Sequence, residues 1–436
     1  MTDPERLAGA VIAKLRAGGH QAWLVGGCVR DLLLGAAPKD FDVSTDARPE
    51  RIMELFPNSG LVGAHFGVIL IRDGSSQVEV ATFRSDHQYE DGRHPASVRF
   101  ETDPREDVLR RDFTINGLLM DPESGQILDY VGGRADLAGR VIRAIGDADA
   151  RFREDHLRLL RAIRFAARLG FEIETGTFQA IARHHASILK ISAERIREEL
   201  VRILTEGGAR RGFEMLEATG LLADILPEVA AMKGVAQPPE FHPEGDVWVH
   251  TLLLLEQLDH PTATLALGAL LHDVGKPPTF RVADRIRFDG HAEIGTQMAH
   301  EILLRLRFSR AEMEQVEALV ANHMRWMDIG RMKQSTLKKF LRIPAIEEHL
   351  ELHRLDCMSG SKRLDHYDFA RRQLEELGTE QLKPKPLLTG DDLIAEGYRP
   401  GPRFAQILSA VEDAQLEGRI QTSDEALALV QSAFPR

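Results

Sequence analysis

Two neighbouring stretches, LVGGCVRDLLLG (24–35) and PKDFDVST (38–45), decide the fold of the N-terminal part of the chain. The first is typical of a strand, a tight turn at Gly26 and Gly27, and a helix. Such a layout leaves free backbone N–H groups at the helix start, where phosphate oxygens bind well. A Gly-Gly turn alone is more often a simple strand-to-helix connection. The second stretch therefore decides whether this turn has a chemical role.

Paired carboxylates follow the glycine turn. Asp40 and Asp42 flank Phe41 in a β-type run, so the period of two places both carboxylates on one face and the ring on the other. Glu79 lies in a second β-type run, VEVATFR, and could join them if the two strands are neighbours. Carboxylate oxygens suit Mg²⁺, and two such ions can activate a hydroxyl and neutralise a leaving pyrophosphate. The pattern predicts metal-dependent phosphoryl transfer.

The composition is that of a globular protein with several domains. Of its 436 residues, 43% are hydrophobic and 28% charged, and no apolar run approaches the length of a membrane span. The first residues lack the basic start and apolar core of a secretory signal, so we expect a cytoplasmic protein that binds no membrane. Cys28 and Cys357 are the only cysteines, which leaves histidines and carboxylates as the expected metal ligands. The net charge of −12 means that an RNA partner needs a local basic surface.

An arginine-rich segment, EDHLRLLRAIRFAARLGF (154–171), predicts one amphipathic helix. On a helical wheel, Glu154 and four arginines form a single stripe opposite an apolar face. These arginines are Arg158, Arg161, Arg164 and Arg168. A stripe of this kind is commonly a solvated face with carboxylate partners elsewhere. In the company of the paired aspartates, an anion is the alternative partner.

A second set of possible metal ligands lies further along, where helical periodicity dominates. Its members are His250, His272, Asp273, His291, His323 and Asp356. Any one of these histidines is more often a core or surface residue than a ligand, so only the set predicts a site. Imidazoles and carboxylates without thiolates suit Mn²⁺, Ni²⁺, Co²⁺ or Fe²⁺, or Mg²⁺ with waters. Such an ion can activate water against a phosphate.

The opening stretches belong to a longer ordered set of motifs. The others are ATFRSD (81–86), YEDGRHP (89–95), RRDFTING (110–117) and the arginine-rich segment (154–171). Over about residues 1 to 230 the set resembles the class II tRNA nucleotidyltransferases and bacterial poly(A) polymerases. The resemblance implies a DNA-polymerase-β-like head in which Asp40 and Asp42 carry the catalytic Mg²⁺. The residues implied to contact the incoming triphosphate are Gly27, Arg30 and Arg111, which agrees with the fit of guanidinium groups to phosphate.

The same resemblance assigns base selection to the arginine-rich segment. Asp155 and Arg158 would offer a base edge one acceptor and several donors. Cytosine and adenine match this pattern, while guanine and uracil would leave buried polar groups unpaired. Arg161 and Arg164 would hold phosphates. The polar loop within TFRSDHQYEDGRHPASVRF (82–100) is shortened in enzymes that add only CC, so we expect CTP, ATP and the tRNA 3′ end as substrates.

The histidines and aspartates of the second set resemble those of HD-domain phosphohydrolases over about residues 245 to 360, with HDVGK (272–276) as the most specific fragment. The metal ligands carried over are His250, His272, Asp273 and Asp356. His291 and His323 match positions found in some members only. The implied activity is hydrolysis of phosphomonoesters or 2′,3′-cyclic phosphates at damaged RNA ends.

These resemblances imply an α+β architecture. The nucleotidyltransferase head has a mixed sheet with helices, and an all-α neck, HD body and tail follow. The expected domains are the head (1–150), a helical neck and RNA-binding region (151–235), the HD domain (236–370) and a helical tail (371–436). The tail carries no chemistry that the residues reveal.

Three alternatives to CCA addition share some of these motifs. A poly(A) polymerase or an enzyme that adds only the terminal A would have the same head motifs. Uridylyltransferases of nitrogen signalling also join a related head to an HD domain, but RRDFTING and the arginine-rich segment oppose that reading. An inactive RNA-binding module would be expected to lose Asp40 or Asp42, and both are present.

Overall fold

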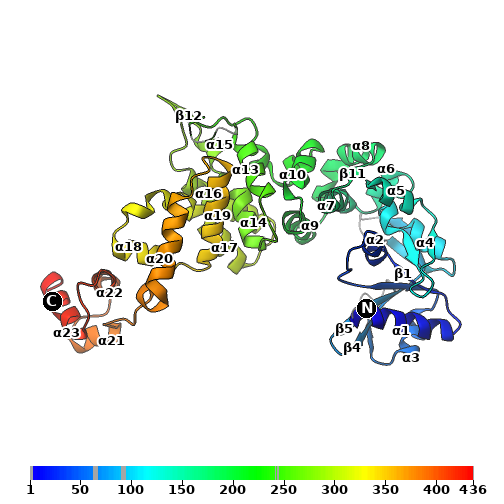
Figure 1. Ribbon diagram of the computed structural model, residues 1–436, viewed down its shortest axis with the longest axis horizontal. Coiled ribbons are helices and arrows are strands. Elements are labelled where there is room, and N and C mark those ends of the chain that lie inside the picture. The colour runs from blue at the N-terminus through cyan, green and yellow to red at the C-terminus, as the bar shows by residue number, and fades with distance from the viewer. Residues whose placement is uncertain (1–2, 62–66, 90–94, 241, 243–244, 436) are drawn as a thin grey trace. The chain divides into compact units, whose positions relative to one another are not determined.

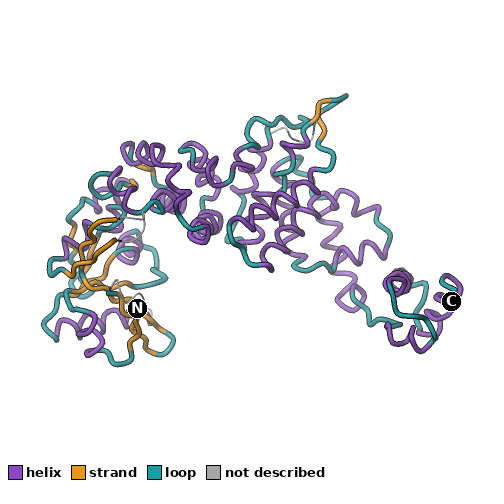
Figure 2. Tube along the Cα trace, turned by 180° about the vertical axis from the view of Figure 1, so that it is seen from behind, coloured by secondary structure: helices purple, strands orange, loops and turns teal. Residues whose placement is uncertain are grey.

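The computed structural model describes residues 3–61, 67–89, 95–240, 242 and 245–435. The chain divides into two compact units, residues 1–230 and 231–436 (Figure 1). The first unit holds the predicted head and most of the predicted neck, and the finer division into four domains remains a prediction. Strands concentrate in the first unit, whereas the second is almost entirely helical (Figure 2), which confirms the predicted α+β class. Among the described residues, no helix has both the length and the apolar character needed to cross a membrane.

A seven-stranded mixed sheet forms the base of the first unit, in the order β3-β4-β5-β2-β1-β8-β9. The strands are β1 (Ala22–Val25), β2 (Asp42–Thr45), β3 (Ser59–Leu61), β4 (Val68–Asp73), β5 (Ser76–Thr82), β8 (Leu118–Met120) and β9 (Ile127–Asp129). β2 and β5 are parallel neighbours, and the other pairs are antiparallel. A separate hairpin consists of β6 (Arg84–Tyr89) and β7 (Pro95–Phe100). The predicted polar loop between them lies largely outside the described residues.

Alternating side chains bury one face of this sheet. Val78 and Val80 of β5 are buried, while Glu79 between them is exposed, as the period of two requires. Helix α1 (Asp3–Ala17) packs against β5 and β1. It buries Ala8, Val11, Ile12 and Leu15, a spacing that gives an α-helix one apolar stripe.

The helices of the first unit surround the sheet and extend beyond it. They are α2 (Gly27–Leu33), α3 (Pro49–Leu55), α4 (Pro104–Leu109), η2 (Thr114–Asn116), α5 (Gly133–Gly139), α6 (Ala148–Glu154), α7 (Arg158–Leu169), α8 (Thr175–His184), η3 (His185–Lys190), α9 (Ala193–Thr205), α10 (Ala209–Ala218), α11 (Leu221–Ile225) and α12 (Pro227–Ala230). A short parallel pair joins β10 (Val141–Ile142) to β11 (Glu172–Ile173).

The prediction of a single helix across residues 154–171 is wrong at its start. Helix α6 ends at Glu154, and α7 begins only at Arg158. Asp155 adopts an extended conformation, and its Oδ1 accepts a hydrogen bond from the Leu157 backbone N–H at 3.0 Å. An aspartate that caps backbone donors in this way favours a break over a continuous helix. Glu154 therefore precedes the arginine stripe instead of belonging to its helix.

The second unit is a helical body with one short hairpin. Its elements are α13 (Val247–Glu256), α14 (Ala263–Leu271), α15 (Lys276–Thr279), β12 (Arg281–Val282), β13 (Ile286–Arg287), α16 (His291–Arg305), α17 (Arg310–Asn322), η4 (His323–Arg331), α18 (Gln334–Leu341), α19 (Ile346–Ser359), α20 (Asp365–Leu382), α21 (Gly390–Ala395), α22 (Pro402–Leu416) and α23 (Ser423–Ala433). Helices α13, α14, α17 and α19 pack against one another. The last three helices enclose a separate apolar cluster around Leu393, Ile407 and Val430.

Candidate functional site

The carboxylates of the first unit gather where β2 and β5 run side by side. In the parallel register, Asp42 pairs directly with Glu79. The two strands are therefore neighbours, which is the condition under which Glu79 was expected to join the aspartates. Asp40 lies just before β2, and Phe41 between the aspartates is buried. Burial and then Glu79 raise the pKa of Asp42 to about 6, with Asp40 adding to the rise and Arg111 opposing it. Converging negative charge of this kind fits a divalent cation.

The glycine turn lies between β1 and α2, as predicted. Gly26 has φ +76°, which favours glycine, and a Cβ there would meet Arg111 Nη1 at 3.2 Å. Gly27 starts helix α2. Arg30, however, is buried: it donates to Asn116 Oδ1 at 2.8 Å and to Asp31 Oδ1 at 2.8 Å. The buried Arg30 side chain thus stabilises the turn through hydrogen bonds, and its contact with a triphosphate remains a prediction.

Arg111 faces the carboxylates from the end of α4. Its Nη2 donates to Asp107 Oδ2 at 2.9 Å and to Ser44 Oγ at 3.3 Å. Asp107 is fully buried, yet Arg111 and Arg110 outweigh burial and lower the pKa of its carboxyl to about 2. Asp107 therefore fixes the Arg111 guanidinium beside Asp42. Asp107 was not predicted from the sequence, although its position four residues before Arg111, a helical spacing, was the available signal.

The arginines of α7 are all paired with carboxylates. Arg161 donates to Asp112 Oδ2 at 2.9 Å, Arg164 lies 2.8 Å from Glu199, and Arg168 lies 3.7 Å from both Asp31 and Glu206. These are the carboxylate partners expected if the arginine stripe is a structural face of the helix and not a site for an anion. Asp112 also accepts from Asn116 Nδ2 at 3.1 Å, a role that was not predicted from the sequence.

Arg158 is held by three oxygen acceptors at the break between α6 and α7. Its Nη1 donates to Glu154 Oε2 at 2.6 Å and to the Arg151 carbonyl at 3.0 Å, while Nη2 donates to the Arg110 carbonyl at 3.0 Å. Within the described chain, the Nε–H and one Nη2–H then have no acceptor. Nε and Nη2 lie along one edge of the planar guanidinium. Asp155, three residues earlier, is half-buried.

The second unit brings all six predicted HD residues together. They come from α13, the turn after α14, the start of α16, the start of η4, and α19. Asp273 lies at the centre. Its Oδ2 is 3.2 Å from His272 Nε2 and 4.0 Å from His250 Nε2, and its Oδ1 is 3.7 Å from His291 Nε2 and 3.8 Å from His323 Nε2. Asp356 Oδ1 lies 3.0 Å from His250 Nε2.

Backbone carbonyls orient three of the histidines. The Nδ1 atoms of His272, His291 and His323 lie 2.9, 2.9 and 2.6 Å from the carbonyl oxygens three residues earlier in the chain. Only an N–H can satisfy a carbonyl, so Nδ1 carries the proton and Nε2 presents its lone pair. Metal-binding histidines are commonly oriented by such contacts.

The inward-facing atoms of this cluster lack donors. His272 Nε2 is buried without a hydrogen bond, and Asp273 Oδ2 accepts none of good geometry although Lys276 Nζ lies 2.6 Å away. His291 Nε2 and His323 Nε2 lie 3.1 Å apart, so two lone pairs face each other. Burial lowers the pKa of His323 to about 4 despite the nearby Asp273 carboxylate, and the ring is neutral at pH 7.

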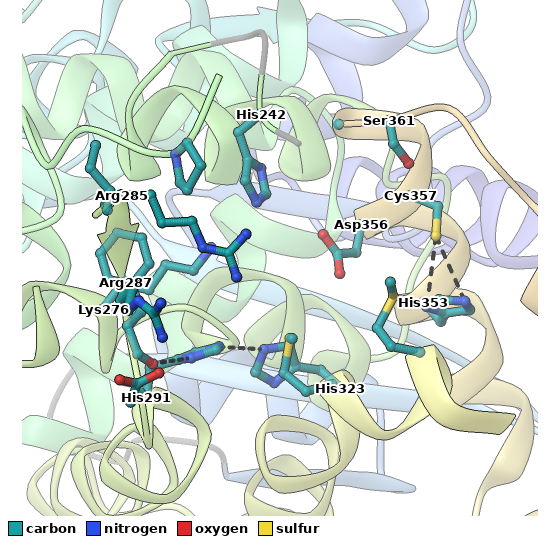
Figure 3. Close-up of a pocket in the computed structure, with 17 residues that line it drawn as sticks. His242, Lys276, Arg285, Arg287, His291, His323, His353, Asp356, Cys357 and Ser361 are labelled. Carbon is teal, nitrogen blue, oxygen red and sulfur yellow. Dashed lines mark hydrogen bonds between the residues drawn. The ribbon is translucent and has the colours of Figure 1, made fainter. Parts of the chain in front are cut away.

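Two ligand groups share Asp273: one with His250 and His272, the other with His291 and His323. The donor set of neutral nitrogens and carboxylate oxygens fits divalent transition metals. A cavity of about 410 Å³ opens over the cluster (Figure 3). The cavity is also lined by Lys276, Arg285 and Arg287. None of them was predicted to have a role, and only Lys276, within HDVGK, had a signal in the sequence.

Comparison with protein families assigns three parts of the chain. Residues 22–143 match the poly(A) polymerase head domain. Residues 170–233 match the probable RNA- and SrmB-binding site of polymerase A, and residues 246–356 match the HD domain.

Two characterised relatives align along nearly the whole chain. A CCA-adding enzyme of Lactobacillus delbrueckii subsp. bulgaricus is 31% identical over 419 residues, or 96% of this chain and 95% of the relative. A CC-adding tRNA nucleotidyltransferase of Thermus thermophilus is 34% identical over 94% of this chain and 93% of its own length. The crystal structure of the Bacillus stearothermophilus CCA-adding enzyme with CTP is 26% identical, has a TM-score of 0.76 and covers 99% and 98% of the two chains. This chain is therefore a nucleotidyltransferase of the family that contains the CCA-adding enzymes.

Proposed function

We propose that the first unit adds C, C and A to the 3′ end of tRNA, with CTP and ATP as substrates. The observation that supports this most is the register that sets Asp42 beside Glu79, with Asp40 next to them and Arg111 opposite. The relatives are named for CCA and CC addition, and one related structure contains CTP. The whole-chain match to a CC-adding enzyme makes the terminal A the point that most needs a test.

Each residue of the site has a distinct task in this proposal. Asp40, Asp42 and Glu79 hold Mg²⁺, which when bound supplies charge neutralisation for the triphosphate and activation of the RNA 3′-hydroxyl. Arg111, fixed by Asp107, binds phosphate oxygens. Gly27 permits close approach of the nucleotide to the backbone, and Arg30 steadies the turn from beneath.

Base selection is proposed for Asp155 and Arg158. The edge of the Arg158 guanidinium that carries Nε and Nη2 suits the adjacent acceptors O2 and N3 of cytosine. The Asp155 carboxylate would accept from the exocyclic amino group of cytosine or adenine. Guanine and uracil present a donor where Arg158 also presents one, and such a mismatch leaves polar groups unpaired. Arg161 and Arg164 would act on phosphates only by exchanging their present carboxylate partners.

Incorporation of labelled CTP and ATP with Mg²⁺ tests this proposal. The tRNA transcripts should end before CCA, after the first C and after both Cs. Three additions to the shortest transcript are expected. Addition of C alone would indicate a CC-adding enzyme, addition of A only to the CC-ending transcript an A-adding enzyme, and long A tails a poly(A) polymerase. Asp42→Ala should abolish incorporation, whereas Asp73→Ala, an exposed aspartate on β4 of the same sheet, should not.

For the second unit, we propose metal-dependent hydrolysis of phosphate esters at RNA 3′ ends. The supporting observation is the set of Nε2 lone pairs that converge on Asp273 with their tautomers set by backbone carbonyls. The expected ligands are His250, His272, Asp273 and Asp356, with His291 and His323 completing a second group. Water would add to phosphorus, the P–O3′ bond would break, and the 3′ oxygen would take a proton.

Release of phosphate from an RNA with a 3′-phosphate end tests the second proposal. Metal-free protein should be loaded in turn with Mn²⁺, Ni²⁺, Co²⁺, Fe²⁺ and Mg²⁺. At least one metal should support release, and His272→Ala should abolish it while leaving CTP incorporation unchanged. Absence of release with every metal would contradict the proposal without touching the first one.

A further inference from the structure

The cavity over the HD cluster has a cationic side that hydrolysis of a single phosphate does not require. Lys276, Arg285 and Arg287 line it on one side, and Asp356 and Cys357 line it on the other (Figure 3). His291 and His323 of the cluster also line the cavity, and a reacting phosphate would bind beside them. A cation further from these ligands needs a different partner.

A short hairpin carries the two arginines to the cavity. In its register, Arg281 pairs with Arg287 and Val282 with Ile286. The rings of Phe280 and Phe288 lie 5.9 Å apart at its base, and Lys276 Nζ lies 5.4 Å from the Phe288 ring. These contacts tie the hairpin to the helical body, so that the turn residue Arg285 is directed over the cavity.

The cationic side chains on this side of the cavity differ in their carboxylate partners. Lys276 is buried and lies 2.6 Å from Asp273, while Arg287 donates two hydrogen bonds to Asp284 Oδ1 at 2.8 and 3.0 Å. Arg281 pairs with Asp289. Across the described parts of the chain, Arg285 has no carboxylate within ion-pair distance. Its charge is therefore available to a ligand.

Apolar side chains of the same cavity can receive a base. Met324 and Met327 line it, and they are 44% and 55% exposed, so their side chains are accessible to a ligand. Phe288 lies on the hairpin side. A volume of about 410 Å³ falls within the range of small-molecule sites. The cavity thus joins three environments: ligand atoms for metal, a free guanidinium, and an apolar wall.

We infer that Arg285 forms a second phosphate subsite, so that the HD pocket selects nucleotides with a phosphate on each side of the ribose, as an RNA 3′-phosphate end has. This inference rests on the proposed hydrolysis for its biological meaning. The terminal phosphate lies on the metal ligands, the base lies against Met324 and Met327, and the 5′ phosphate of the same nucleotide accepts from Arg285. A guanidinium can bind that phosphate through two parallel hydrogen bonds.

Two ligands that differ by one phosphate test the inference: adenosine 3′,5′-bisphosphate and adenosine 3′-monophosphate. Equilibrium binding should be measured with Mn²⁺ and with EDTA, and 3′-phosphate release with Mn²⁺. We expect the wild-type chain to prefer the bisphosphate by about tenfold, in both dissociation constant and KM. Arg285→Gln should remove that preference and leave monophosphate binding and kcat unchanged. Arg281→Gln, on the same hairpin but outside the cavity, is the matched control and should keep it.

Thermal unfolding should be unchanged in both variants, because both side chains are exposed. Equal affinity of the wild type for the two ligands, or a preference that survives Arg285→Gln, would overturn the inference. Failure of phosphate release together with an Arg285-dependent binding preference would refute hydrolysis and leave the subsite standing. Phosphate release without any preference for the bisphosphate would support hydrolysis and refute the subsite.

Discussion

The two candidate metal sites of this chain are built on different principles. In the first unit, the ligands are carboxylates at the edge of a sheet: Asp40 and Glu79 are exposed, and the pKa of Asp42 is raised to about 6 by burial and by Glu79. In the second unit, the cluster is buried except for the partly exposed Asp356, and backbone carbonyls orient three of its imidazoles. From this difference we expect that a metal enters the head together with the nucleotide, whereas the HD domain retains its metal.

The largest expected effect separates the two sites by activity. Asp42→Ala removes the carboxylate that pairs with Glu79, and we expect nucleotide incorporation to fall by at least about 100-fold because charge neutralisation is lost. Phosphate release by the HD domain should be unchanged. An assay of both activities on one preparation is the measurement. Incorporation that persists in this variant would refute the proposed role of the head carboxylates.

Metal retention should distinguish the sites next. After gel filtration without chelator, we expect wild-type protein to keep metal, and His272→Ala to bind it at least about tenfold more weakly. Metal analysis by mass spectrometry measures this. His300→Ala is the matched control, because His300 belongs to α16 of the same unit but pairs with Glu317 at 2.8 Å. Equal metal content in both variants would contradict a resident metal at the cluster.

Acid should weaken Mg²⁺ binding in the head before it protonates His323 of the cluster. In the proposed head site, Mg²⁺ binding needs ionised Asp42, and the raised pKa of this carboxyl means that protons should compete once the pH falls to about 6. The Mg²⁺ concentration for half-maximal incorporation should therefore rise about tenfold per pH unit below that value. Titrations of Mg²⁺ between pH 8 and 5 test this. A midpoint near 4 would show that Asp42 is not perturbed. Over the same range His323, with a pKa of about 4, stays neutral and able to bind metal.

The smallest expected effect concerns the arginine stripe that supports the head. Arg164 and its partner Glu199 are both buried, so Arg164→Ala should cost about 3 kcal/mol of unfolding free energy. Arg168 is partly exposed and its pairs are long, so Arg168→Ala should cost less than about 1 kcal/mol. Urea unfolding measures both. If Arg164→Ala left stability unchanged but reduced CTP incorporation, phosphate binding would outweigh the structural role.

Local chemistry made much of this predictable from sequence. The strand, glycine turn and helix at residues 22–33, the alternation around Phe41 and the six HD residues all follow from patterns within a few positions or from the ordered motifs. What could not be predicted depends on contacts between distant segments. The Asp42–Glu79 register arises only because β2 pairs with β5, and the partner of Arg161 is 49 residues away at Asp112. Arg285 becomes a candidate phosphate-binding residue only because the neighbouring cations already pair with carboxylates, and the sequence does not reveal this pairing.

The carbonyl contacts of the HD histidines have a further consequence for how metal enters. Each imidazole is oriented by a carbonyl three residues before it, at Ala269, Phe288 and Val320. The orientation of each ring is thus set by a backbone contact within the same turn of the chain. Metal uptake would require neither refolding nor a search among side-chain rotamers, in contrast to small domains that fold only around zinc. The three imidazoles would thus accept a metal in orientations that their local backbone already sets.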